Sequence, residues 1–420
     1  MKLNHSRPAG AVWLAIFVCA TFVVLCGTAQ GQTFSVLYTF TGQHDGGNPL
    51  GTPMMDANGN FYGTTYYNGT TGWGTVYKLS PQSSGYVMTT LYTMGSGGAT
   101  DGQNPYGNLV QDSSGVLYGA AWEGGTYDVG TVFSLRPYPK ALPIPVFSPM
   151  WPTWLHSFDF SDGEYPFFGD LTIDSHGNLY GTTMYGGSYG QGTVYKLTPS
   201  SNGWTFQTLY NFAPGGSVGA FPISGVTLDA AGNLYGTTTK GGTSNNGVVY
   251  EVTPSGVGTV LYNFTGGADG SFPMAGLTFD VFGNLYGATS VGGTAGGGAV
   301  FELSPGNGGW TYSFVYPITG WGFESNLGTG IWRSLIIDRA GNLYGVTCPI
   351  ETGYNSTVFE LTPGANGWSY TPLYTFRSGA DGSLSEAGLV RDSQGNLYGV
   401  SSFDGADNYG TFWEITPAGH

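Results

Sequence analysis

One segment, Asp-x-x-Gly-Asn-Leu-Tyr-Gly, recurs seven times along this chain of 420 residues. Two copies vary, because Phe61 replaces the leucine of the first and Val116 replaces the asparagine of the second. Successive copies begin 51 to 62 residues apart, and a regular period of about this length is typical of solenoids and propellers. The fold must therefore contain seven similar units. Their first residues, which we call the repeat aspartates, are Asp56, Asp112, Asp174, Asp229, Asp280, Asp338 and Asp392.

Each unit contains four short apolar segments separated by Gly, Asn or Pro. In the fourth unit they span residues 225–229, 234–238, 248–252 and 260–264, with the alternation, aromatic content and turn residues typical of strands. Four antiparallel strands in about 50 residues make one β-propeller blade. We therefore predict an all-β, seven-bladed propeller. A solenoid is the alternative, but it needs atypical capping repeats, and both end repeats are ordinary.

The two ends of the chain indicate a closed ring. Residues 35–40 match the fourth strand of a unit, and residues 410–417 match the third. We therefore expect the N-terminal strand to complete the last blade. An open array would gain nothing from this offset.

The first 31 residues are typical of a secretory signal peptide. Lys2 and Arg7 give a positive start, residues 11–26 are an apolar run, and Ala29 and Gly31 offer small side chains at a cleavage site. The run is short for a membrane span. We predict a signal peptide at 1–31 and a propeller at 32–420, without a membrane span, in a secreted protein that is extracellular or periplasmic.

The unit also resembles a known repeat family. In the third unit the pattern is carried by residues 174–183, Gly186, Gly187, residues 192–199, Trp204 and residues 209–212. It is similar to the GloVer tandem repeat of secreted bacterial proteins, and its Gly-Gly, Tyr and Trp spacing is similar to that of kelch repeats. The resemblance covers essentially all of the chain after residue 31. It implies export and a propeller, and it implies no particular activity.

Composition and charge exclude several functions. The net charge is −15, whereas binding to nucleic acid needs clustered Lys and Arg, so we expect no nucleic-acid partner. The sequence holds no phosphate loop, metalloprotease helix or nucleophile elbow, and its histidines form no ligand cluster. Cys348 is the only cysteine after residue 31, and we expect it to fill a gap in the core.

Asp-Gly pairs before the first strand of five units form one set of candidate site residues. Antiparallel order places them on the same face as the long Gly-rich loops between strands two and three, where binding residues are common. Five carboxylates around one rim would suit Ca²⁺, the one cofactor that the sequence suggests. The alternatives are capping of turns and acid/base catalysis of glycoside cleavage. The five are Asp45, Asp101, Asp162, Asp269 and Asp381.

Aromatic residues in the loops between strands two and three form the second set. Rings beside carboxylates suit sugars, whose C–H faces stack while their hydroxyls form hydrogen bonds. The alternative is packing within the loops themselves. The candidates are Tyr66, Tyr67, Trp73, Trp122, Tyr127, Tyr185, Tyr189 and Tyr409.

Three functions are consistent with these features. The leading hypothesis is a non-catalytic module that binds extracellular polysaccharide or a cell-surface glycan. One alternative is a carbohydrate-active hydrolase or lyase that uses the rim carboxylates. The other is a scaffold that binds a surface protein, with the stiff, proline-rich insertion at 136–154 as its docking arm. We expect the chain to be a monomer.

Overall fold

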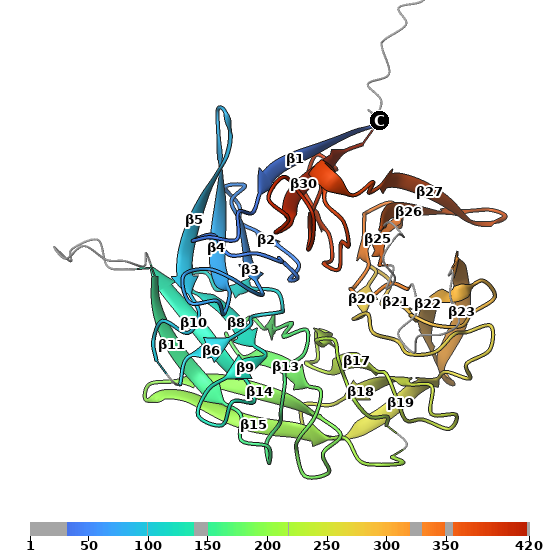
Figure 1. Cartoon of the computed structure of the whole chain (residues 1–420). Coiled ribbons are helices and arrows are strands. Elements are labelled where there is room, and N and C mark those ends of the chain that lie inside the picture. The colour runs from blue at the N-terminus through green and yellow to red at the C-terminus, as the bar shows by residue number, and fades with distance from the viewer. Residues whose placement is uncertain are drawn as a thin grey trace, which may run out of the picture.

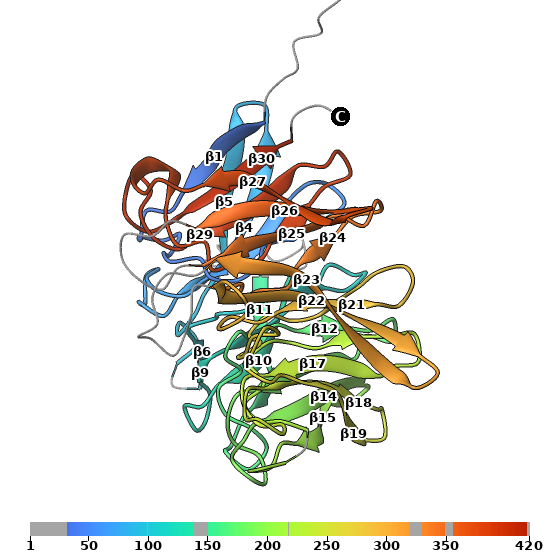
Figure 2. The ribbon, with the colours of Figure 1, turned by 90° about the vertical axis from the view of Figure 1, so that its right-hand side faces the viewer.

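Seven four-stranded antiparallel sheets stand radially around a common axis (Figure 1). The structure is a computed structural model that describes residues 32–98, 100–137, 150–216, 218–319, 330–348 and 356–417. The predicted signal peptide and residues 138–149 of the proline-rich insertion lie outside these ranges. Within them the only helix is a short 3-10 turn, η1 (Gly379–Asp381). The prediction of an all-β propeller with seven blades is confirmed, and Figure 2 shows the ring from its side.

Each blade begins with a two-residue strand near the axis, and the following strands lie progressively farther out (Figure 1). Blade one holds β2 (Met54–Met55), β3 (Phe61–Thr65), β4 (Thr75–Gln82) and β5 (Gly85–Thr93); blade two holds β7 (Val110–Gln111), β8 (Leu117–Ala121), β10 (Thr131–Pro137) and β11 (Met150–Ser157), with a small extra ribbon of β6 (Gly102–Gln103) and β9 (Glu123–Gly124). Blade three holds β12 (Thr172–Ile173), β13 (Leu179–Thr183), β14 (Thr193–Ser200) and β15 (Gly203–Asn211); blade four holds β16 (Thr227–Leu228), β17 (Leu234–Thr238), β18 (Val248–Val252) and β19 (Gly258–Asn263).

The remaining blades follow the same order. Blade five holds β20 (Thr278–Phe279), β21 (Leu285–Ala288), β22 (Gly296–Gly306) and β23 (Gly309–Thr319); blade six holds β24 (Ile336–Ile337), β25 (Leu343–Thr347), β26 (Thr357–Gly364) and β27 (Gly367–Thr375). Blade seven holds β28 (Val390–Arg391), β29 (Leu397–Ser401), β30 (Thr411–Thr416) and β1 (Thr33–Thr39). The last pairing closes the ring as predicted: β1 lies antiparallel to β30, with Phe34 opposite Ile415 and Thr39 opposite Thr411.

The repeat aspartates hold the tight turn between the first and second strands. In blade three Asp174 Oδ1 accepts the backbone N–H groups of His176 and Asn178, both at 2.9 Å. Its Oδ2 accepts the amide of Asn178 at 2.7 Å and the hydroxyl of Tyr180 at 3.0 Å. Gly177 takes a φ of 80°, which glycine adopts without strain. The recurring Asp, Gly, Asn and Tyr are therefore one structural unit, and their conservation between blades needs no catalytic explanation.

The Gly after each repeat tyrosine makes room for a ring of its own blade, and the Thr that follows it in blades one, three and four bonds to the next blade. A Cβ on Gly181 would lie only 2.4 Å from the hydroxyl oxygen of Tyr195 on the neighbouring strand. The next residue, Thr182, donates its hydroxyl to the carbonyl of Ser224 in blade four at 2.8 Å. Thr64 makes the equivalent bond to Gly107 at 3.1 Å. These bonds link adjacent blades beside the axis.

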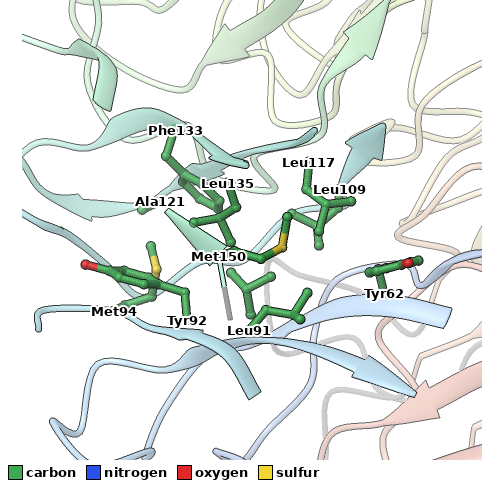
Figure 3. Packing of buried hydrophobic residues seen from close by; sticks show 11 residues of the cluster. Tyr62, Leu91, Tyr92, Met94, Leu109, Leu117, Ala121, Phe133, Leu135 and Met150 are labelled. Atoms are coloured by element: carbon green, nitrogen blue, oxygen red, sulfur yellow. The ribbon is translucent and has the colours of Figure 1, made fainter. Parts of the chain in front are cut away.

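The hydrophobic core lies between blades rather than within them. Figure 3 shows the cluster between blades one and two, where Leu91 and Tyr92 of β5 face Leu117 of β8 and Phe133 of β10. Each blade buries both faces in this way, so its strands carry apolar residues toward both neighbours. Burial between successive sheets makes the ring a single packed structure.

Candidate functional site

Two kinds of connection share one face of the ring, as predicted. The segment that enters a blade pairs with the loop between its second and third strands. Gly47 bridges Tyr67 in blade one, and β6 pairs with β9 in blade two. We call this side the loop face. The opposite side carries the turns of the repeat aspartates, and we call it the turn face.

The Asp-Gly carboxylates cap the loops in which they lie. In blade five Asp269 Oδ1 accepts the hydroxyl of Thr265 at 2.6 Å and the N–H of Gly267 at 3.1 Å. Its Oδ2 accepts the N–H of Thr265 at 2.7 Å and the hydroxyl of Tyr262 at 3.0 Å. Asp45 makes the same four kinds of hydrogen bond where the chain enters blade one. These two side chains therefore act as caps.

Each of the other three carboxylates also accepts a backbone N–H of its own loop, from Gly97, Asp159 and Arg377 in turn. Asp101 is fully buried and accepts the hydroxyl of Tyr92 at 2.7 Å, and its burial raises its pKa. Asp162 lies 2.8 Å from Nε2 of His156. Asp381 accepts the hydroxyl of the strand-four tyrosine that precedes it, at 2.7 Å. Each carboxylate thus contacts its own loop and its own outer strand.

The rim carboxylates do not gather into one site. Asp101, Asp162 and Asp269 belong to three different blades, and no hydrogen bond joins one to another in the described ranges. Across these ranges no group of three or more His, Cys, Asp or Glu side chains is arranged to hold a metal ion.

Four of the predicted aromatic residues join a chain of ring contacts across blades one to four. Tyr67 packs edge-on against Tyr66 with 4.3 Å between centroids, and Tyr66 lies 5.8 Å from Trp122. Trp122 lies 6.0 Å from Tyr165, which in turn lies 6.4 Å from Tyr185. We call the whole chain the aromatic arc. Its other members are Tyr106, Phe167, Phe168 and Phe221.

The aromatic arc is exposed at Tyr67 and Tyr185 and buried or partly buried between them. Tyr66 is buried, Trp122 is partly buried, and Tyr67 and Tyr185 are 50% and 38% exposed. An aromatic ring that is left half in water loses the hydrophobic stabilisation that burial would give. Covering these two exposed rings with a ligand would therefore be favourable.

Two glutamates lie beside the aromatic arc. Glu123, the first residue of β9, directly follows Trp122, and Glu164 directly precedes Tyr165. Burial raises the pKa of both carboxyls, and the nearby Asp128 adds to the shift at Glu123. Both glutamates also raise the pKa of Tyr165, which places their charge close to that ring. The arc therefore combines apolar faces with hydrogen-bond acceptors.

The other predicted aromatic residues lie apart from the arc. A Cβ on Gly95 would meet the ring of Trp73 at 2.6 Å, and a Cβ on Gly42 would meet that of Tyr409 at 2.4 Å. These two rings therefore cover Gly-rich backbone, as the packing alternative predicts. The remaining two, both more than half exposed, are Tyr127 and Tyr189.

Side chains from all seven blades fill the axis, and sequence reasoning missed them. Each comes from the position six residues before a repeat aspartate, where the chain enters its blade. That constant offset is the signal that would have revealed them. The seven, which we call the axial plug, are Leu50, Tyr106, Phe168, Ile223, Met274, Trp332 and Glu386.

One arginine forms hydrogen bonds to several of the segments that carry the axial plug. Arg333 is 5% exposed and lies one residue after a plug position, where the other blades have Gly, Ala or Ser. Its Nη1 donates to Asp170 of blade three, 3.0 Å from Oδ2. Its Nη2 donates to the carbonyls of Leu50 and Tyr106, and its Nε to that of Glu386. The guanidinium of blade six thus contacts four other blades.

The two polar members of the axial plug are joined. The hydroxyl of Tyr106 donates to Glu386 Oε2 at 3.0 Å. Burial raises the pKa of Glu386, although Tyr106 and Arg333 oppose the shift. The nearby Cys348 is buried as predicted, and burial raises its pKa, which disfavours the reactive thiolate.

A cavity of about 390 Å³ lies on the axis along the innermost strands. Its wall contains Leu, Ile and Val side chains together with threonines, including Thr172, Thr227 and Thr278, one from each of three consecutive blades. Asp170 lies in the same wall, where Arg333 holds it. The lining mixes polar and apolar groups, and Asp170 is its one carboxylate.

None of the helical structure in the described ranges is long or apolar enough to cross a membrane. This finding concerns residues 32–417 with the gaps given above. The predictions of secretion and of a signal peptide concern residues outside those ranges and stay predictions.

Comparison with known proteins places the chain by its repeats. No curated protein matches it significantly. Solved structures match at low identity: polysaccharide lyase Uly1 (12% identity, 88% of this chain and 90% of the other, TM-score 0.47), and a puromycin hydrolase (11%, 84% and 50%, 0.47). A protein proposed to be a 6-phosphogluconolactonase, from Bacteroides uniformis ATCC 8492, also matches (13%, 80% and 86%, 0.47). Residues 23–144 and 148–329 match the family model of the Gloeobacter/Verrucomicrobia repeat, and the chain therefore belongs to that family.

Proposed function

We propose that the loop face binds polysaccharide and that the aromatic arc is the binding surface. The observation that carries this proposal is the unbroken series of ring contacts from Tyr67 to Tyr185, half-exposed at both of these residues. Isolated exposed rings are common on proteins, whereas these two are joined through buried and partly buried rings into one packed series.

The chemistry of the arc suits a sugar chain better than a wholly apolar ligand. Pyranose rings offer C–H faces to Tyr67, Trp122 and Tyr185, and their hydroxyls donate to acceptors such as Glu123 and Glu164. The arc extends over several blades, so it would hold several sugar units in a row. Export of the chain, as residues 1–31 predict, would bring it to such polymers outside the cell.

A hydrolase or lyase is the second candidate, and one observation favours it. Glu386 is a partly exposed carboxyl with a raised pKa at the axis, and it is bonded to Tyr106 of the aromatic arc. A carboxyl of this kind is suited to donate a proton to a leaving group. The rim aspartates that we first considered for this role are committed to their own loops.

A polysaccharide screen that reads binding and product together tests both candidates. The chain without residues 1–31 is incubated with soluble and insoluble polysaccharides, and bound protein and released sugars are measured in the same tube. Binding without product supports the proposal. Product that disappears with Glu386→Gln supports the second candidate, and absence of both signals contradicts both.

A further inference from the structure

A groove on the turn face separates blades five and six. Its volume is about 600 Å³, and its floor includes Tyr286, Ile337, Pro363 and Trp368. We call it the blade-five groove. The ring of Trp368 lies edge-on to that of Tyr286, with 6.2 Å between their centroids.

The same groove exists between blades two and three, where it measures about 470 Å³. We call this one the blade-two groove. Its floor repeats the pattern position by position, with Tyr118, Ile173, Pro199 and Trp204. The repeat therefore dictates the floor of both grooves. The two grooves differ in the residues that form their walls.

One wall of the blade-five groove carries apolar side chains at three positions that are polar in the blade-two groove. In blade two the positions around the repeat aspartate are occupied by Gln111, Ser113 and Ser114. The same positions in blade five are occupied by Phe279, Val281 and Phe282.

Two of these side chains are almost fully exposed to solvent, Val281 at 87% and Phe282 at 83%. The corresponding pair in every other blade consists of Ala, Asn, Ser, Gln, His or Arg residues. The fold does not require an apolar pair here. The turn itself is closed by Asp280 in the usual way, with the N–H groups of Phe282 and Asn284 both at 2.8 Å from Oδ1.

The opposite wall carries a positive charge. Arg339 is exposed and replaces the Ser175 of the blade-two groove. The neighbouring Asp338 is already paired with Arg391, 3.8 Å away, and none of the ion pairs between described residues uses Arg339. The groove thus has exposed apolar side chains on one wall, a tryptophan in its floor, and one uncommitted cation.

We propose that the blade-five groove binds a peptide segment of another protein, with an apolar side chain between Phe282 and Trp368 and a neighbouring carboxylate on Arg339. A recess with a tryptophan floor fits an inserted side chain, and the arginine is placed to pair with one carboxylate. The net charge of −15 would repel a strongly acidic partner, so a single carboxylate suits the site better than an acidic run. The same charge disfavours an anionic lipid surface and a second copy of this chain.

Selection of peptides on the intact propeller tests this inference. A library of random peptides displayed on phage is selected on the wild-type chain and, in parallel, on Val281→Ser/Phe282→Ser. That double variant copies Ser113 and Ser114 of blade two and should fold normally. Recovered peptides are then synthesised, and their affinities are measured by fluorescence anisotropy.

The proposal expects enriched peptides that share an apolar residue beside an Asp, a Glu or a free C-terminus. Their affinity should fall at least about tenfold with Phe282→Ser, since one buried aromatic side chain contributes that much. It should also fall with Arg339→Ser and stay unchanged with His176→Ser in the blade-two groove.

Three results would overturn it. One is the absence of peptides enriched over the double variant. Another is self-association of the wild type in sedimentation that the double variant abolishes, which would make a second copy the occupant. The third is binding to phosphatidylcholine and phosphatidylglycerol vesicles that the double variant abolishes, which would make the site a lipid contact.

Discussion

Arg333 of blade six and Asp170 of blade three form an ion pair across the axis, with 3.0 Å between Nη1 and Oδ2. The arginine is nearly buried, and its remaining N–H groups donate to carbonyls of three further blades. Propellers usually rely on contacts between adjacent blades. Here one side chain also joins blades that do not touch along the ring.

Replacement of Arg333 by Met should destabilise the ring strongly. The change leaves Asp170 without its counter-ion and three carbonyls without a donor, and loss of one partner of a buried pair costs about 3–5 kcal/mol. Urea unfolding followed by tryptophan fluorescence measures the effect. Asp170→Asn should cost less, because Asn keeps an acceptor for Arg333, and an equal cost for both variants would contradict this account.

Acid should unfold the propeller through the repeat aspartates. Burial alone would raise the pKa of Asp174, but its hydrogen bonds from Asn178 and Tyr180 outweigh this and lower it; Asp56, Asp112 and Asp229 behave alike. A carboxyl with a lowered folded-state pKa stabilises the fold above its unfolded pKa of about 4, and this contribution is lost as the pH falls through the folded value. The urea midpoint should therefore drop between about pH 5 and pH 2. The drop should be smaller in Asp174→Asn, and an unchanged drop would argue against this role.

Two rim aspartates should respond in different ways to the same substitution. Asp269→Asn replaces one acceptor oxygen by an amide nitrogen, so Thr265 loses an acceptor together with either Gly267 or Tyr262. The free energy of unfolding should fall by about 1–3 kcal/mol. Asp101 is buried with a raised pKa, so its stabilising contribution is complete below its unfolded pKa and is lost as the pH rises through the folded value. Asp101→Asn should thus be nearly neutral or stabilising at pH 7. Thermal melts of both variants at pH 7 make the comparison, and the reverse order of stability would contradict it.

Removal of the hydroxyl of Tyr195, a third-strand tyrosine, should stabilise the fold. The Tyr195 hydroxyl is buried and has no hydrogen-bond partner within the described ranges, and blades two, five and six have Phe133, Phe301 and Phe359 at the same place. Tyr195→Phe should raise the free energy of unfolding by about 1 kcal/mol, because a buried, unpaired polar group is costly. Chemical denaturation of the single variant checks this. Destabilisation would indicate a buried water bound to the hydroxyl.

Much of the fold can be predicted from the sequence because each blade repeats the same short-range pattern of residues. The turn of Asp174, Gly177 and Asn178 is fixed by short-range hydrogen bonds, and the matching strands at the two chain ends require closure. Both features are visible in seven copies of one pattern. The face on which the loops lie also follows, since antiparallel strands alternate in direction.

The candidate site was only partly predictable, because it depends on contacts between distant segments. Tyr66, Tyr67, Trp122 and Tyr185 were expected on the loop face, but nothing local distinguishes them from Trp73 and Tyr409, which cover glycines. Arg333 lies in a segment without a recognisable motif. Its role depends on carbonyls and a carboxylate that are 53 to 283 residues away in the chain.

The most direct test of the central claim is the affinity of aromatic-arc variants for the polysaccharide that the screen identifies. Isothermal titration should show at least about a tenfold loss for Tyr67→Ala and for Tyr185→Ala, because each removes an apolar face that the sugar covers. Tyr189→Ala, which removes an exposed ring outside the arc, should bind like the wild type. Equal losses for all three variants, or none for the two arc variants, would contradict binding at the aromatic arc.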